Sequence, residues 1–192
     1  MEKNSQRLAT ALLVMDIQEG TIGRVADSKT LLHTLGQAIA AARTAKIPVI
    51  YVVVGFRKGF PEIGDGVYNK SFAALKGGSF PGLEEPVPVD AAIAPQPGEM
   101  VVTKRRVSAF AGSDLEVILR AHRIEHLVLA GISTSGVVLS TLRQAADMDY
   151  RLSVLSDGCA DTDNEVHSVL VNKVFPRQAE VLTVMQWIDG LA

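Results

Sequence analysis

Three groups of polar residues each follow a short apolar run, and their types suit acid–base or nucleophilic chemistry. Asp16 comes directly after ALLVM, Lys104 follows VVT, and residues 131–138, GISTSGVV, follow LVLA. A positioned carboxyl and ammonium group can transfer protons to and from a substrate and stabilise charge on it. Residues 131–138, hereafter the elbow, form a predicted strand-to-helix turn with two serines. The backbone N–H groups at the start of such a helix suit a developing oxyanion.

The apolar runs are predicted strands, and amphipathic helices are predicted between them. We expect Gly131 to end the fourth strand and Trp187 to pack in a last turn, and a weak helix is predicted at 71–75. The expected strands span 7–15, 49–55, 100–103, 124–130, 151–155 and 180–184, and the expected helices 28–46, 114–123, the elbow to about 150, and 163–174. This alternation predicts an α/β fold with a doubly wound parallel sheet, whose strands' carboxyl ends share one edge.

The segment 56–98 breaks the pattern, because it is rich in glycine and proline. A segment of this length inside one domain is typical of a functional lid or a partner-binding arm. Four phenylalanines make it too apolar to be free in water: Phe56, Phe60, Phe72 and Phe80. We therefore expect a homo-oligomer, a dimer or larger, in which this segment contributes to the interface or to the neighbouring pocket.

Composition bounds the remaining possibilities. The 192 residues fit a single domain, 1–192, and 47% hydrophobic residues supply a sizeable core. A net charge of −2 and one tight basic cluster, KRR at 104–106, argue against nucleic-acid binding. No apolar run approaches the length needed to span a membrane, the N-terminus has no signal-peptide pattern, and one cysteine allows no internal disulfide. We expect a cytoplasmic protein with a small-molecule substrate.

Three stretches, LLVMDIQ, VVTKRRVSAF and LAGISTSGVVLSTLRQAAD, together resemble the isochorismatase-like cysteine hydrolases. That superfamily includes nicotinamidases, N-carbamoylsarcosine amidohydrolases and isochorismatases, and the resemblance covers residues 7–185. It implies a Rossmann-like three-layer fold with six parallel strands in the order 3-2-1-4-5-6, and an Asp, Lys, Cys triad. Asp16 and Lys104 match the first two members. The cysteine position falls on Val137, so the nucleophile is absent.

The resemblance also implies the rest of the site. The peptide bond between Ile132 and Ser133 would be cis, with backbone N–H groups forming an oxyanion hole. The implied residues for substrate or oxyanion binding are Gln18, Ser108, Phe110, Ile132, Ser133, Ser135 and Gly136, with Arg105 as a further pocket wall. Nicotinamidases carry a metal motif of Asp and His after the second strand, whereas GFRKGFPEIGDG in that position has no His. We expect neither a metal nor a cofactor.

Valine cannot attack a carbonyl carbon, so the chemistry must differ from that of the cysteine enzymes. Cys159 follows a different strand, and Ser133 or Ser135 would need a general base. No His falls in the three motifs, and the four histidines are expected on solvated surface, in helices or at their ends. Isochorismatases offer another route, because a vinyl ether hydrolyses through a positioned acid and water.

Two functions follow from this sequence. One is a hydrolase of a small amide, ureide or vinyl ether that uses Asp16 and Lys104. The other is a non-catalytic member that binds a small molecule or serves as an oligomeric scaffold.

Overall fold

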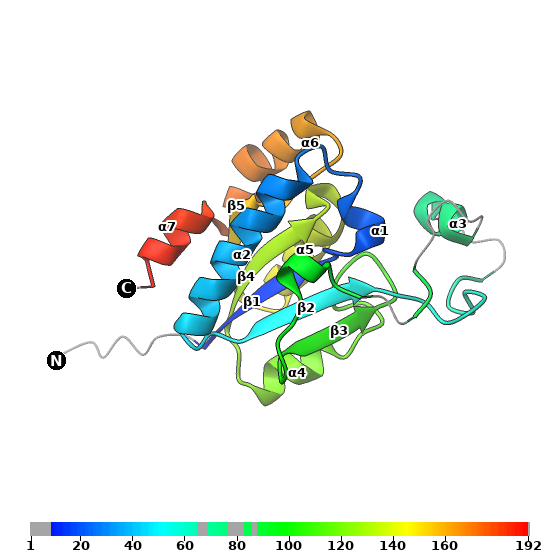
Figure 1. Ribbon diagram of the computed structural model, residues 1–192, viewed down its shortest axis with the longest axis horizontal. Coiled ribbons are helices and arrows are strands. Elements are labelled where there is room, and N and C mark those ends of the chain that lie inside the picture. Colours follow the sequence, from blue (N-terminus) through cyan, green and yellow to red (C-terminus); the bar gives the residue numbers. More distant parts are fainter. Residues whose placement is uncertain (1–8, 65–68, 77–82, 86–87, 192) are drawn as a thin grey trace.

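A six-stranded parallel sheet forms the centre of the protein in the computed structural model, which describes residues 9–64, 69–76, 83–85 and 88–191 (Figure 1). The strands lie in the order β3-β2-β1-β4-β5-β6, which confirms the expected fold. Their bounds are β1 Thr10–Met15, β2 Val49–Val54, β3 Met100–Lys104, β4 His126–Ile132, β5 Arg151–Ala160 and β6 Glu180–Leu182. Residues 7 and 8 of the expected first strand lie outside the described residues.

Helices cover both faces of the sheet (Figure 1). The α-helices are α1 Glu19–Ile22, α2 Ser28–Thr44, α3 Lys70–Lys76, α4 Leu115–Ala121, α5 Leu139–Asp147, α6 Asn164–Val169 and α7 Val184–Asp189. Shorter turns are η1 Ala91–Ile93, the π-helical η2 Thr134–Val138 and η3 Leu170–Val174, and η4 Phe175–Arg177. No helix among the described residues is both long and apolar enough to cross a membrane.

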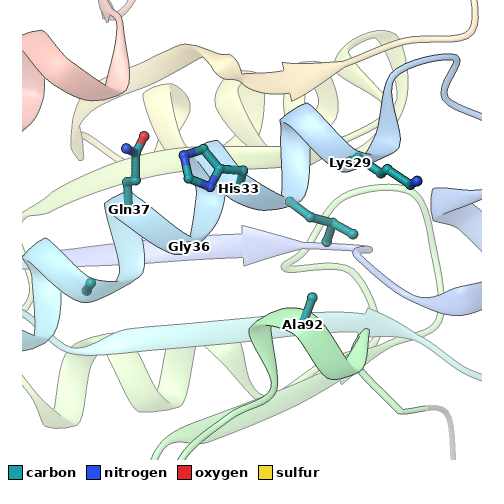
Figure 2. A pocket seen from close by; sticks show the side chains of 7 residues that line it. Lys29, His33, Gly36, Gln37 and Ala92 are labelled. Atoms are coloured by element: carbon teal, nitrogen blue, oxygen red, sulfur yellow. The ribbon is translucent and has the colours of Figure 1, made fainter.

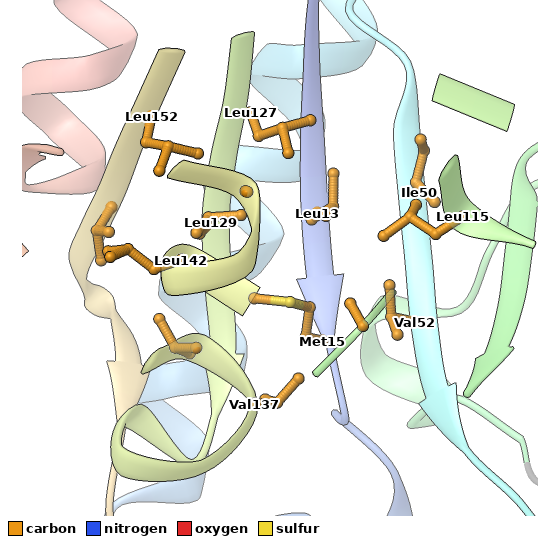
Figure 3. Close-up of a cluster of buried hydrophobic side chains, with 14 of the residues drawn as sticks. Leu13, Met15, Ile50, Val52, Leu115, Leu127, Leu129, Val137, Leu142 and Leu152 are labelled. Carbon is orange, nitrogen blue, oxygen red and sulfur yellow. The ribbon is translucent and has the colours of Figure 1, made fainter. Parts of the chain in front are cut away.

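The central strand β1 divides the core into two apolar layers. Leu13 and Met15 pack with α4 and α5 on one face (Figure 3), whereas Leu12 and Val14 pack with α2 and α7 on the other. This alternation follows from the two-residue period of a strand. Full burial of one such side chain contributes roughly 1.5–3 kcal/mol, so β1 is fixed in register and its carboxyl end has a defined position.

Gly131 does not end β4, contrary to the sequence prediction. The strand continues to Ile132, and Gly131 lies opposite Met15 of β1. Its φ is 144°, and a Cβ at this position would lie 2.2 Å from the carbonyl oxygen of Met15. The glycine therefore permits a close approach of two backbones inside the sheet, rather than a turn.

β5 also continues beyond its predicted end at residue 155, because it contains a bulge. Val154 pairs with Leu129 and Cys159 pairs with Gly131, so five steps along β5 match two along β4. In the bulge, the carboxylate of Asp157 accepts a hydrogen bond from the backbone N–H of Val184 (2.7 Å). Residues 156–160, which lie beyond the predicted end of the strand, are part of it and extend it to Ala160.

The described parts of the segment 56–98 pack on themselves and on the KRR motif. Phe56 and Phe72 are buried with Ile63 and Leu83, and Phe60 packs against this cluster. The guanidinium of Arg105 donates to the carbonyl of Gly55 (2.7 Å) and to Glu85 (2.8 Å), and that of Arg106 donates to the carbonyl of Glu62 (2.9 Å) and lies 5.3 Å from the centre of the Phe72 ring. Three of the four phenylalanines are thus covered within the chain, and Phe80 lies outside the described residues.

Candidate active site

Asp16 and Lys104 form a buried ion pair at the carboxyl edge of the sheet. Asp16 follows β1 and Lys104 ends β3, so the pair spans the end of β2. The ammonium nitrogen lies 2.9 Å from Oδ2 of Asp16 and donates a hydrogen bond to the carbonyl of Arg106 (3.0 Å). The two residues are 7% and 3% exposed. The parallel arrangement of β1 and β3 brings the two side chains within hydrogen-bond distance, and their positions at the carboxyl ends of predicted strands led us to expect this.

The second carboxylate oxygen of Asp16 is free to act on a ligand. Oδ1 is buried and has no hydrogen-bond partner among the described residues. Burial raises the pKa of the Asp16 carboxyl, although Lys104 opposes this shift. A carboxyl group with a raised pKa and an unpartnered oxygen can hold a proton, and release it, closer to neutral pH. This is the arrangement that a general acid or base requires.

The elbow begins with a cis peptide bond between Ile132 and Ser133. The π-helical turn Thr134–Val138 follows and continues directly into α5. The carbonyl of Ser133 accepts hydrogen bonds from the N–H groups of Gly136 (3.1 Å) and Val138 (3.3 Å). The side chain of Ser133 makes no capping hydrogen bond to the turn that follows.

Val137 lies in the elbow and faces the apolar core. It is 2% exposed and belongs to the same buried cluster as Met15, Ala109 and Phe110. Figure 3 shows Val137 beside Met15, at the carboxyl end of β1. Phe110 in turn stacks on Tyr150, with ring centroids 6.2 Å apart. Val137, to which the sequence resemblance assigns the cysteine position, therefore offers an apolar surface and no nucleophilic atom.

Gln18 and Ser108 use their polar atoms to join elements at this edge. The amide nitrogen of Gln18 donates to the carbonyl of Val54 (3.1 Å), and its amide oxygen accepts from the N–H of Val54 (2.8 Å). The hydroxyl of Ser108 donates to Gln144 of α5 (2.7 Å) and accepts from the N–H of Phe110 (3.3 Å). These contacts fix the carboxyl end of β2 and join the segment after β3 to α5.

Two residues that sequence reasoning missed contact the elbow. The N–H of Ser135 donates to Oδ2 of Asp161 (2.7 Å), and the hydroxyl of Thr134 lies 2.8 Å from Nδ1 of His167. The N–H of Ser135 is therefore engaged by Asp161, and the role of Ser135 in substrate or oxyanion binding stays a prediction. Asp161 ends the stretch SDGCAD (156–161), and polar residues directly after the fifth predicted strand (151–155) were a usable signal. His167 had none.

The pKa values of these two residues are shifted by their surroundings. Burial opposes the charged form of Asp161, but hydrogen bonds from Ser135 and from the backbone that follows lower the pKa of its carboxyl below the usual value. Burial lowers the pKa of His167, although the nearby charge of Asp161 opposes that shift. A carboxylate and a neutral imidazole therefore contact the elbow at neutral pH.

Cys159 is not arranged as a nucleophile. It is buried in β5, its sulfur lies 3.9 Å from the carbonyl of Leu129, and burial raises the pKa of the thiol to about 12. The expectation that all histidines are solvated also fails at His126, which lies in β4. Its ring contacts the hydroxyls of Thr10 (3.2 Å) and Ser153 (2.9 Å), and burial, with the charge of Arg151, lowers its pKa to about 4.

A surface hollow or a group of metal-ligating side chains elsewhere could also mark a site. The hollow in Figure 2, of about 530 Å³, runs along α2, and it contains none of the predicted site residues. Its lining residues include Lys29, His33, Gly36, Gln37 and Ala92. Across the part of the chain that the structure describes, no three or more His, Cys, Asp or Glu side chains are grouped to hold a metal ion.

Comparison with known proteins places this geometry in a family. Residues 10–186 match the family model of the Isochorismatase domain. The uncharacterized isochorismatase family protein YecD of Escherichia coli O157:H7 is 30% identical over 190 residues, covering 95% of this chain and 96% of that protein. The ureidoacrylate amidohydrolase RutB of Stutzerimonas stutzeri is 32% identical, over 77% of this chain and 68% of that protein.

A solved structure of an isochorismatase family protein from Burkholderia thailandensis superposes with a TM-score of 0.83 at 26% identity, and 95% of each chain is covered. The chain belongs to the isochorismatase family of hydrolases.

Proposed function

We propose that this protein hydrolyses a small amide, ureide or vinyl-ether metabolite, with Asp16 and Lys104 as its catalytic residues and no covalent intermediate. One observation carries the proposal. The two side chains form a buried pair at 2.9 Å, and one carboxylate oxygen of Asp16 has no partner among the described residues. Burial of a charged pair adds little net stability because both groups lose their hydration, so a function in the reaction accounts for the pair better than stability does. The unpartnered oxygen can accept a proton from a substrate or from water.

For an amide or ureide, water would add to the carbonyl carbon while Asp16 accepts a proton from that water. The ammonium of Lys104 would stabilise the negative charge that forms on the carbonyl oxygen. Asp16 would then pass the proton to the leaving nitrogen as the C–N bond breaks, which yields an acid and an amine. Val137 would serve as an apolar wall in place of a thiolate.

For a vinyl ether, the protonated form of Asp16 would donate to the terminal vinyl carbon. Water would add to the resulting oxocarbenium carbon and return a proton to the carboxylate, and the adduct would collapse to a carbonyl compound and an alcohol. The raised pKa of Asp16 supports this role as an acid. The relative named ureidoacrylate amidohydrolase favours a ureide as the first substrate class to test.

The second candidate is a member that binds a small molecule without turning it over. Val137 favours it, because the side chain is packed in the core cluster and offers no nucleophile. Binding of a ureide or an amide without product formation would support this candidate. Calorimetry with a panel of amides, ureides and vinyl ethers measures binding, and comparison with product formation for the same compounds separates the two functions.

The decisive experiment is a hydrolysis screen over amides, ureides and vinyl ethers with purified protein. Asp16→Asn and Lys104→Met should each reduce turnover by roughly 10²–10⁴-fold, the usual contribution of general acid–base groups. Asp189→Asn and Lys173→Met, both exposed, are the matched controls and should leave turnover unchanged. Hydrolysis that persists in both site variants, or its absence with every compound, would contradict the proposal.

A homo-oligomer, a dimer or larger, remains part of this proposal. Exposed apolar side chains support it at two places, Val101 on the edge strand β3 (49% exposed) and Val117 on α4 (70% exposed). Light scattering at micromolar concentration should report more than one chain per particle, and a strict monomer would contradict the proposal. A cytoplasmic location is proposed from the lone cysteine, which is buried as a free thiol.

A further inference from the structure

The elbow is held from one side by two residues that follow β5, and their arrangement points to a role in the reaction. We propose that Asp161 and His167 are positioning residues, which fix the elbow relative to Asp16 and Lys104. The role in turnover rests on the proposed hydrolase function. The placement of the elbow by these residues does not depend on it.

The sheet itself places Asp161 beside the elbow. Ile132, the last residue of β4, pairs with Ala160, the last residue of β5. Asp161, the next residue of the chain, therefore lies beside the cis peptide between Ile132 and Ser133. Its carboxylate accepts a hydrogen bond from the N–H of Ser135 (2.7 Å). The bulge in β5 sets this register, because without it the strand's end would meet a different residue of β4.

His167 holds the neighbouring residue from the same side. Thr134 is fully buried, and its hydroxyl lies 2.8 Å from Nδ1 of His167, which projects from α6. Thr134 and Ser135 are the first two residues of the π-helical turn that contains Val137. One contact acts on a side chain and the other on the backbone, so together they fix both the position and the orientation of this turn.

The backbone hydrogen bonds at the start of the turn come from the N–H groups of Gly136 and Val138, which donate to the carbonyl of Ser133. Asp161 accepts from a different group, the N–H of Ser135. Asp161 and His167 also line a cavity of about 250 Å³, together with Asp27, Thr30 and Asn164, rather than filling the apolar core. The two residues therefore contact the elbow from a hollow of mixed polar and apolar lining. A displacement of about 1 Å in such an element costs roughly 10²-fold in rate.

Residue-resolved amide hydrogen exchange, measured by NMR on the full chain, tests the placement without a substrate. Asp161→Ala should raise the exchange rate of the Ser135 amide by about tenfold or more, and Asp161→Asn by less, because asparagine keeps an acceptor oxygen. His167→Ala and Thr134→Val should each raise exchange across 134–138, and the double variant should raise it no further. The amides of Leu13 and Leu129, at the centre of the sheet, are the internal controls and should keep their wild-type rates.

Kinetics on any compound that the wild type hydrolyses tests the role in the reaction. Asp161→Ala and His167→Ala should lower kcat by about tenfold or more with little change in KM, and Asp161→Asn and His167→Gln should recover much of the loss. Unchanged Ser135 exchange in Asp161→Ala, or an equal rise at Leu13 and in the elbow, would overturn the placement. A wild-type kcat in both alanine variants would overturn the role in turnover. If the wild type hydrolyses nothing, the hydrolase function fails, and the exchange data still decide the placement.

Discussion

The ammonium of Lys104 lies 2.9 Å from Oδ2 of Asp16, and the two residues come from strands that are not neighbours in the sheet. β2 lies between them, so the pair closes over the end of the intervening strand. Gln18 clamps that same end through both polar atoms of its amide. The pair is thus held by three rigid strands, which favours precise geometry for the proposed acid–base chemistry.

Lys104→Met should destabilise the protein more at pH 8 than at pH 5. The substitution leaves the buried carboxylate of Asp16 without its cation, at a cost of about 3–5 kcal/mol. Burial raises the pKa of Asp16 above its unfolded value of 3.8, so as the pH falls the folded protein binds a proton at Asp16 before the unfolded chain does. The loss of stability caused by Lys104→Met therefore becomes smaller at lower pH. Urea unfolding at both pH values measures this, with Lys173→Met as the control. An equal penalty at pH 5 and pH 8 would disprove the account.

His126 should make the protein less stable as the pH falls from 6.5 toward 4. Its pKa is about 4 in the folded protein against 6.5 in the unfolded chain, so between these values the unfolded chain binds more protons. The resulting loss of unfolding free energy is complete below pH 4. It is at most about 3 kcal/mol, and partial exposure of the ring makes it smaller.

His126→Gln should remove this component from the pH dependence of the unfolding free energy. His33→Gln, on the exposed side of α2, is the matched control. A pH profile of His126→Gln parallel to that of the wild type would show that the ring is not a source of acid sensitivity.

Gly131→Ala should be severely destabilising, by about 3 kcal/mol or more, or should prevent folding. Its Cβ would lie 2.2 Å from the carbonyl oxygen of Met15, in a backbone conformation that alanine rarely adopts. Gly36→Ala is the control, because a Cβ in that part of α2 meets nothing within 4 Å. It should stabilise the helix by roughly 0.5–1 kcal/mol. Thermal melts compare the two, and similar melting temperatures would refute the close approach.

Val137→Cys should create a thiol that reacts faster than Cys159. The introduced thiol would lie at the start of a helix, on the same edge of the sheet as Lys104, and both features lower a thiol pKa below ~8.5. Burial of position 137 in the apolar cluster opposes this shift, so the labelling rate measures which effect is larger. Burial raises the pKa of Cys159 to about 12, so it is the internal reference. Alkylation with iodoacetamide at neutral pH, followed by peptide mass spectrometry, compares the two thiols in one sample.

Lys104→Met in the same background should slow labelling at position 137. Labelling there that is equal to or slower than labelling of Cys159 would mean that the elbow is not built to activate a thiol.

The sequence predicted the positions of Asp16 and Lys104 because each follows an apolar run, and the ends of parallel strands share an edge. It failed where strands contain residues typical of turns. Gly131 and the bulge around Asp157 are kept in strands by pairing with a neighbour, and propensity does not encode that pairing. The contacts from Asp161 and His167 to the elbow join residues 26 and 33 positions apart, so no local periodicity announces them.

The placement of β2 between β1 and β3 also bears on how the protein folds. Asp16 and Lys104 can meet only after three strands have joined in register, so we expect the pair to form late, on the native side of the rate-limiting barrier. Mutations of the pair should therefore accelerate unfolding and leave the refolding rate nearly unchanged. A chain trapped with β3 undocked would carry both side chains but would lack the buried ion pair.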